Sequence, residues 1–303
     1  MEREIIDRRA LKEKSEDTGI PFSNLLAGYV LEELLYLIAD SDFAPYLWLK
    51  NSEILGLEQY KKKNLLTLEF SYVTDESTGK AQALVPGQEL SQKMGYVMLA
   101  SILKKEKTPE IKWKGRAAFD GAKVELELAG EFDELTVPLH VCVEKMAGEE
   151  HMPTRKEFLP FMREQQAIGY LEYPPENMLT DRLFLMLRDL ELIPEMNSYE
   201  QVYEILTSEE IDGRHIKEQL EKQCQKEGLP LEESRGKEIL SYKTYPHMRK
   251  RFEKYLRSQG KKEPGWDEVM DVICAFLPRI WSAICEDTIF FGDWMPKLGR
   301  FLD

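Results

Sequence analysis

Apolar and polar positions alternate with two different periods along the first half of the chain. Residues 3–18 and 25–38 have apolar side chains at helical spacing, and the second of these faces is broad enough for a core helix. The continuous apolar run at 46–49 predicts a short buried strand, and residues 65–73 predict a second strand. A short helix is expected between them, near residues 53–60.

Three further strands are predicted after a helix at residues 87–105. Residues 110–119 contain spaced apolar side chains, and residues 122–129 and 135–144 alternate between apolar and polar side chains. Such alternation is typical of strands with one face in water, as in antiparallel or mixed sheets. Pro138 lies in the last of these strands, and proline has no N–H to donate to a neighbouring strand.

The chain changes to helices and loops from about residue 165, with no strand predicted beyond it. Pro174-Pro175 precedes a strongly amphipathic helix, and further helices are predicted at 199–207, 214–228, 235–258 and 266–286. We therefore predict an α+β protein. A mixed sheet with flanking helices occupies residues 1–165, and an all-helical domain occupies residues 166–303.

Composition narrows the class of protein. The formal net charge of the 303 residues is −14, so the average surface repels nucleic acid and anionic lipid. The four cysteines stand far apart without histidines at metal-ligand spacing, which favours reduced thiols in a cytoplasmic protein. The charged N-terminal residues argue against a signal peptide. No window approaches the roughly 18 to 20 continuous apolar residues of a membrane span, so we expect no membrane contact.

A resemblance rests on several segments taken in order. They are YVLEELLYLIADSDF from residue 29, the Leu49-Lys50 pair before a turn, VPLHVCVE at 137–144, YPPENMLTDRL from residue 173, and the tail between Trp266 and Trp294. Their order and spacing resemble the AbiEii/AbiGii family of nucleotidyltransferase-like proteins. Members of that family supply the toxin of bacterial type IV toxin-antitoxin and phage-abortive systems. The resemblance covers nearly the whole chain and implies a nucleotidyltransferase-like sheet domain.

The resemblance implies transfer of a nucleotide from a nucleoside triphosphate to an acceptor hydroxyl, with Mg²⁺ as cofactor and an antitoxin as partner. In the family, a D-x-D pair and a third aspartate on a neighbouring strand hold the metal, and a Gly-Gly or Gly-Ser turn meets the phosphates. The catalytic positions of the family fall on Thr67, Glu69 and Cys142. The nucleotide-binding positions fall on Lys50, Asn51, Ser52, Lys63 and Arg182.

The sequence departs from the family at most of these positions. Asn51-Ser52 places side chains where the backbone should approach phosphate, and Thr67 and Cys142 replace carboxylates. Only Glu69 remains as a metal ligand, because a thiol is poorly suited to Mg²⁺. Each lost carboxylate removes an attraction on the order of 4 kcal/mol for a charge pair at ~4 Å. We therefore expect a degenerate, inactive site in a protein that acts by binding a partner or nucleic acid.

Two alternatives remain open. An active transferase requires Glu69 with rearranged ligands, for which Glu144 and Asp75 are the candidates because they lie on or directly after the same predicted strands. The other alternative is a purely structural or interaction protein.

The segment 235–262 contains ten lysines and arginines and two glutamates, with four aromatic residues between them. Basic and stacking side chains together suit RNA or single-stranded nucleic acid. A solvated helix whose cations pair with the acidic remainder of the chain is the competing interpretation. The candidate nucleic-acid contacts are Arg249, Lys250, Arg251, Lys254 and Arg257. The interleaved aromatic residues are Tyr242, Tyr245, Phe252 and Tyr255.

Overall fold

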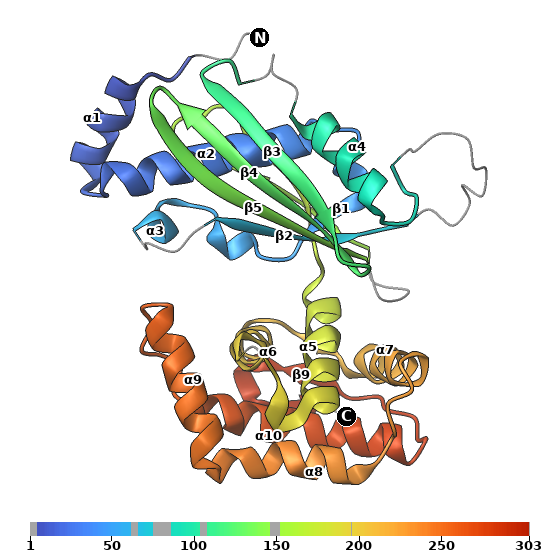
Figure 1. The fold of residues 1–303 in the computed structure, drawn as a ribbon. Coiled ribbons are helices and arrows are strands. Elements are labelled where there is room, and N and C mark those ends of the chain that lie inside the picture. The colour runs from blue at the N-terminus through green and yellow to red at the C-terminus, as the bar shows by residue number, and fades with distance from the viewer. Residues whose placement is uncertain are drawn as a thin grey trace. The chain divides into compact units, whose positions relative to one another are not determined.

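The computed structural model describes residues 5–61, 66–74, 86–103, 108–145, 152–194 and 196–302. The chain forms two compact units, Met1–Met146 with Pro153–Tyr173 and Ala147–Met152 with Pro174–Asp303 (Figure 1). The predicted boundary after residue 165 therefore falls after residue 173. The reason is strand β7 (Ile168–Glu172), which pairs in parallel with β1 (Leu47–Leu49) and completes the sheet.

The first unit is built on a seven-stranded mixed sheet with the order β3-β4-β5-β2-β1-β7-β6. Strand β2 runs parallel to β5, and β1 runs parallel to β7, whereas the other neighbours are antiparallel. The remaining strands are β2 (Thr67–Tyr72), β3 (Ile111–Phe119), β4 (Lys123–Phe132), β5 (Leu135–Lys145) and β6 (Thr154–Phe158). The helices are α1 (Arg8–Thr18), α2 (Phe22–Ala39), α3 (Leu57–Tyr60) and α4 (Gln92–Ile102), with 3-10 turns η1 (Ala44–Tyr46) and η2 (Ser52–Ile54).

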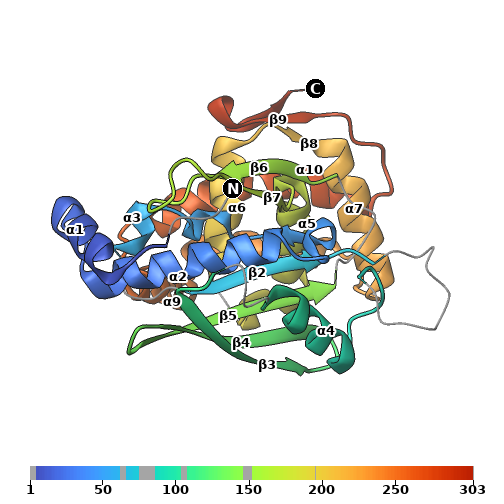
Figure 2. The ribbon, with the colours of Figure 1, turned by 90° about the horizontal axis from the view of Figure 1, so that it is seen from above.

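The two faces of this sheet differ in polarity because strand residues alternate sides. Leu68 and Phe70 of β2 are buried on the face that helices α2 and α4 cover (Figure 2). Gly130 of β4 lies against α2, where a Cβ atom would come within 2.4 Å of Val30 Cγ1. Glu69 lies between Leu68 and Phe70 on β2, so its side chain belongs to the opposite face. The sheet therefore has one apolar, helix-covered face and one polar face.

A buried charge network ties α2 to the loop before β7. Arg163 Nε lies 2.8 Å from Glu33 Oε1, and the same guanidinium also pairs with Glu110. The hydroxyl of Tyr29 donates to Glu110 Oε1 at 2.6 Å. Because the side chains of Arg163, Glu33 and Glu110 are at most 5% exposed, each carboxylate depends on Arg163 for compensation of its charge.

Among the described residues, α2 is one helix that is long and apolar enough to cross a membrane by length and composition. The window contains Glu32 and Glu33, so it is not the continuous apolar run that the expectation concerned. Its apolar character has a structural reason in this fold, since 67% of that window is buried inside the protein.

The second unit is mostly helical. Its helices are α5 (Pro175–Asp189), α6 (Asn197–Ser208), α7 (Gly213–Lys226), α8 (Glu233–Ser241), α9 (Pro246–Ser258) and α10 (Trp266–Cys285), with 3-10 turns η4 (Leu190–Leu192), η5 (Tyr242–Thr244) and η6 (Pro296–Leu298). The helix predicted over 235–258 is divided into α8, η5 and α9. A small sheet of β8 (Ile211–Asp212), β9 (Asp293–Met295) and β10 (Arg300–Leu302) is also present, so the expectation of no strand beyond residue 165 was wrong.

This small sheet closes the core around α10. Trp294 of β9 is fully buried, and its Nε1 donates to Leu206 O at 2.7 Å. The predicted α+β class is confirmed, with a mixed sheet, flanking helices and a helical C-terminal region.

Candidate functional site

The residues after β1 extend its pairing with β2 through a side chain. The N–H of Lys50 donates to Glu69 O at 2.8 Å. Asn51 then takes the place of the main chain, since its Nδ2 donates to Thr67 O at 2.8 Å and its Oδ1 accepts from the Glu69 N–H at 2.9 Å. Both polar atoms of this amide hold the turn against β2, so Asn51 has a structural role at the position where nucleotide contact was predicted.

Ser52 begins the 3-10 turn η2, and its hydroxyl donates to Glu172 Oε1 at 2.7 Å. The other oxygen of Glu172 lies 3.4 Å from Lys156 Nζ. Burial, with help from the Glu172 charge, raises the pKa of the neighbouring Tyr170, and the hydrogen bond from Ser52 opposes this. The turn predicted to meet phosphates therefore has a carboxylate bonded to it, and that negative charge repels a phosphate.

Lys50 is the basic residue that directly follows β1. Its side chain is 9% exposed, with Nζ 3.4 Å from Glu144 Oε2 and 5.3 Å from the centre of the Tyr173 ring. The ammonium group is attracted both by the carboxylate and by the electron-rich face of the ring. These contacts fix Lys50 beside β5.

The parallel register of β2 and β5 brings the predicted catalytic positions together. Glu69 is the register partner of Cys142, and Thr67 is the partner of His140 two residues earlier. On the other side of β5, Glu125 of β4 is the partner of Cys142. Because paired residues point to the same side of a sheet, these five side chains share the polar face.

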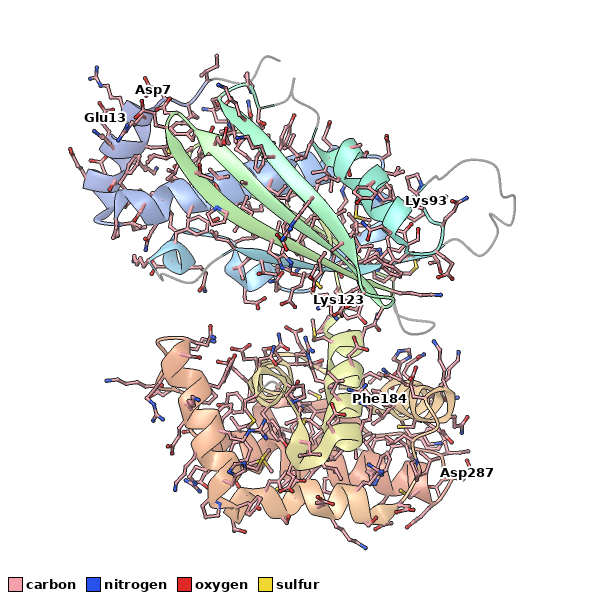
Figure 3. All side chains as sticks on the ribbon, in the orientation of Figure 1. Asp7, Glu13, Lys93, Lys123, Phe184 and Asp287 are labelled. Carbon is pink, nitrogen blue, oxygen red and sulfur yellow. The ribbon has the colours of Figure 1, made fainter. Side chains whose placement is uncertain are left out.

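Cys142 is buried at this face, and its thiol is unsuited to nucleophilic or metal chemistry. Burial raises the pKa of the thiol to about 11, with a further contribution from the negative charge of Glu144. The ammonium of Lys123 (labelled in Figure 3) opposes this rise. The thiol is therefore neutral at ordinary pH, whereas nucleophiles and metal ligands act as thiolates.

The carboxylates of this face already have cations beside them, with one exception. Lys123 Nζ lies 2.8 Å from Glu125 Oε1, and Lys50 holds Glu144. Glu69 has no ion pair of its own within the described part of the chain. In that same part, no group of three or more His, Cys, Asp or Glu side chains could hold a metal ion. The donor set does not fit Mg²⁺, which prefers several hard oxygen ligands.

Sequence reasoning missed the charged residues that surround these positions. Lys123 and Glu125 lie on a strand whose alternation was recognised, so their side of the sheet was open to prediction. Glu172 lies in β7, where no strand was predicted, and its contact with Ser52 spans 120 residues of sequence. No local pattern in the sequence predicts such a contact.

The other predicted residues lie elsewhere. Lys63 and Asp75 fall outside the described residues. Arg182 belongs to α5 of the second unit, where it is 9% exposed and its Nε has no hydrogen-bond partner. Thr180, also on α5, has a buried hydroxyl without a partner. The first turns of α5 therefore hold buried polar groups that the described residues leave unsatisfied, which is unusual and costly in a folded protein.

In the basic segment 235–262 of the second unit, two of the five predicted nucleic-acid contacts are bonded to other residues of the chain. Arg249 forms two bonds to the Asp267 carboxylate, at 2.8 and 2.6 Å. Arg251 donates to the backbone oxygens of Glu191 and Ile193. Lys250, Lys254 and Arg257 are exposed, and Arg257 lies 4.0 Å from Glu253.

Most aromatic residues of this segment do not face solvent. Tyr242 and Phe252 are buried in the core of the second unit, so the prediction that they stack on bases was wrong. Tyr255 is half-buried and donates its hydroxyl to Glu200. Tyr245, at 42% exposure, is the member of the set that remains on the surface.

Comparisons with known proteins yield two distant structural likenesses. No protein-family model matches the chain, and no curated protein matches it. The crystal structure of JHP933 from Helicobacter pylori has a TM-score of 0.43 at 7% identity, covering 88% of this chain and 94% of that one. A candidate nucleotidyltransferase from H. pylori has a TM-score of 0.41 at 9% identity, covering 88% and 97%. At these scores, neither likeness carries an argument about function.

Proposed function

We propose that this chain is a nucleotidyltransferase-like protein that acts by binding a partner protein or RNA rather than by metal-dependent nucleotidyl transfer. The observation that carries the proposal is the pairing of Glu69 with Cys142 across β2 and β5. This register keeps the arrangement of strands that the family resemblance requires, while placing a neutral thiol and Thr67 where carboxylates are needed. The strand arrangement expected of a transferase site is thus combined with side chains that do not support metal-dependent nucleotidyl transfer.

Three further features agree with a loss of transfer. Asn51 is committed to β2, Ser52 is bonded to Glu172, and Lys50 is paired with Glu144. A triphosphate at this turn would have to break an ion pair and displace a carboxylate. Each such change opposes nucleotide binding, because contacts with the phosphates would have to replace the ion pair and the hydrogen bond that are lost.

The test is incubation of the chain with labelled nucleoside triphosphates, Mg²⁺ or Mn²⁺, and total RNA. The expected result is no label transfer above that of a heat-treated sample. The matched control is Glu69→Gln, which removes the surviving family carboxylate while keeping its size. Label transfer by the natural chain that disappears in Glu69→Gln would overturn the proposal in favour of an active transferase with rearranged ligands.

The binding role is tested separately from catalysis. RNA affinity is measured for the natural chain and for a Lys250→Glu/Lys254→Glu variant, because these two cations are exposed on α9. Binding through phosphates weakens steeply with salt and with charge reversal. If the chain binds RNA by this surface, both dependences are expected; affinity that ignores both favours a partner protein, such as the antitoxin that the family resemblance implies.

A further inference from the structure

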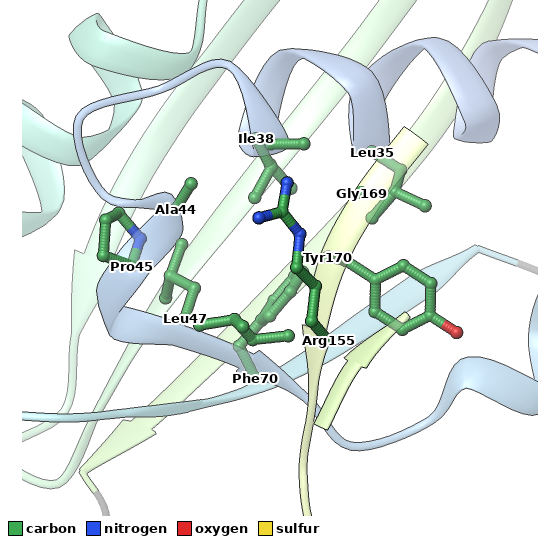
Figure 4. Close-up of a pocket in the computed structure, with 11 residues that line it drawn as sticks. Leu35, Ile38, Ala44, Pro45, Leu47, Phe70, Arg155, Gly169 and Tyr170 are labelled. Atoms are coloured by element: carbon green, nitrogen blue, oxygen red, sulfur yellow. The ribbon is translucent and has the colours of Figure 1, made fainter. Parts of the chain in front are cut away.

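A pocket of about 310 Å³ lies in the first unit and is separate from the polar face of the sheet (Figure 4). It is lined by residues of α2, η1, β1, β2, β6 and β7. Phe70 and Leu47 contribute to it, and their strand neighbours Glu69 and Trp48 point to the other side by alternation. The pocket therefore belongs to neither the predicted catalytic positions nor the turn at Asn51.

Most of the residues that line this pocket have apolar side chains. Nine of its eleven residues have aliphatic or aromatic hydrocarbon side chains or none: Leu35, Ile38, Ala39, Ala44, Pro45, Leu47, Phe70, Gly169 and Leu171. The remaining two are Arg155 and Tyr170. A mostly hydrophobic cavity with very few polar groups is the usual form of a small-molecule site, in which the polar groups set the orientation of the ligand.

Arg155 is the charged residue of the pocket. It lies on β6, and in Figure 4 its side chain extends from that strand toward α2. Its Nη2 is close enough to β7 that a Cβ atom on Gly169 would lie 3.8 Å away. Within the described residues, Arg155 has no carboxylate partner, whereas the adjacent Lys156 is paired with Glu172.

An arginine with its guanidinium beside an apolar cavity and without an acidic partner is a ready anion-binding group. The planar guanidinium donates two parallel hydrogen bonds to a carboxylate, and this geometry is more selective than that of an ammonium group. The neighbouring apolar surface favours a ligand that also has a hydrocarbon part, because burial of that part removes apolar area from water.

We propose that this pocket binds a small carboxylate with an apolar body, such as a medium-chain fatty acid. The hydrocarbon occupies the space between Ile38, Leu47 and Phe70, and the carboxylate accepts hydrogen bonds from Arg155. The volume of about 310 Å³ has room for about ten non-hydrogen atoms, at roughly 30 Å³ for each. Octanoate has this size. The proposal is independent of whether the chain transfers nucleotides.

The experiment is calorimetric titration of the full chain with octanoate and, separately, with 1-octanol, which has the same chain without the charge. Saturable one-to-one binding of octanoate is expected, with at least tenfold weaker binding of octanol. In Arg155→Gln, octanoate affinity is expected to fall about tenfold toward the octanol value while octanol affinity is unchanged, as for the loss of a charge-assisted hydrogen bond.

Two control variants separate the roles of charge and cavity. Lys156→Gln removes the adjacent positive charge and should leave octanoate affinity unchanged. Ala39→Leu adds side-chain volume to the pocket from α2, with a residue that favours helix, and should weaken both ligands. Absence of octanoate binding, equal affinity for octanol, or an unchanged octanoate affinity in Arg155→Gln would each overturn the proposal.

Discussion

Replacement of Glu32 by glutamine is predicted to stabilise the protein at neutral pH. Glu32 lies on α2 and is fully buried. Its Oε1 accepts from the Tyr60 hydroxyl at 2.9 Å, and its Oε2 accepts from the Phe161 N–H at 3.2 Å. Burial raises the pKa of Glu32 well above its ordinary value, and the charge of Glu33 adds to this, whereas the two hydrogen bonds and Lys14 oppose it. The folded protein therefore holds the proton of this carboxyl more tightly than the unfolded chain does.

The sign of the pH dependence follows from this shift. The unfolded chain releases the proton of Glu32 near pH 4 to 5, whereas the folded chain retains it to higher pH. Stability from this residue is thus greatest below the ordinary pKa and falls as pH rises toward the raised pKa. The slope is about 1.4 kcal/mol per pH unit while the folded carboxyl stays protonated. The loss grows with each pH unit up to the raised pKa.

Glutamine removes this loss and keeps the shorter of the two contacts. Its Oε1 can accept from the Tyr60 hydroxyl as the carboxyl oxygen does, whereas its Nε2 cannot accept from the Phe161 N–H, so the longer contact at 3.2 Å is lost. The assay is hydrogen exchange of the α2 amides at several values of pH, corrected for intrinsic rates. Exchange is preferred to a single melting curve because two units need not unfold together.

Glu33→Gln is the matched control on the same helix. Glu33 is hydrogen-bonded to Arg163, which also pairs with Glu110, so Glu33→Gln weakens one charge-assisted hydrogen bond and should destabilise the first unit by about 1.5 to 3 kcal/mol. If Glu32→Gln destabilises the first unit at pH 7 and leaves its pH dependence unchanged, Glu32 is ionised in the fold and the reasoning is refuted.

Three other predictions concern the sheet. Asn51→Ala removes both hydrogen bonds to the β2 backbone and should lower the free energy of unfolding of the first unit by about 1 to 3 kcal/mol, measured by urea denaturation. Cys142, with a thiol pKa of about 11, should react with iodoacetamide at least ~100-fold more slowly at pH 7 than a free thiol, and its rate should rise about tenfold per pH unit up to that pKa. Gly130→Ala should lower the free energy of unfolding by about 1 to 3 kcal/mol because its Cβ would lie 2.4 Å from Val30 Cγ1. Gly121→Ala is the control, since its Cβ would have open space around it and its φ is positive, so that it measures backbone strain alone.

Strict alternation made the centre of the sheet predictable. In residues 122–129 and 135–144, every second side chain is apolar, so the pattern fixes which residues face α2 and which face water. The same period places Thr67 and Glu69 on one side of β2. The family resemblance implies that Cys142 lies on a strand next to that of Glu69, and in the structure β2 and β5 are neighbours with Glu69 opposite Cys142.

The edge of the sheet gave no comparable signal. Strand β6 has four exposed residues out of five, with the sequence TRKEF, and β7 is five residues long. Short edge strands take their conformation from pairing with distant residues, so local propensity does not reveal them. The domain boundary, the Glu172 contact and the pocket beside Arg155 all depend on these two strands.

The prediction for the basic segment 235–262 relied on the chemistry of its side chains and neglected their helical spacing. Met248, Phe252 and Leu256 recur every four residues and are all buried, as expected of one face of an amphipathic helix. Phe252 thus belonged to a core face that the sequence displays. The exposed positions between them hold the cations.

Binding of Mn²⁺ tests the central claim most directly, namely that the frame of the site is retained without the ligands. It is measured by electron paramagnetic resonance for the natural chain, for Thr67→Asp/Cys142→Asp, and for the size-matched Thr67→Asn/Cys142→Asn. We predict saturable Mn²⁺ binding for the aspartate variant and none at this site for the other two. Saturable binding by the natural chain that Glu69→Gln abolishes would contradict the account.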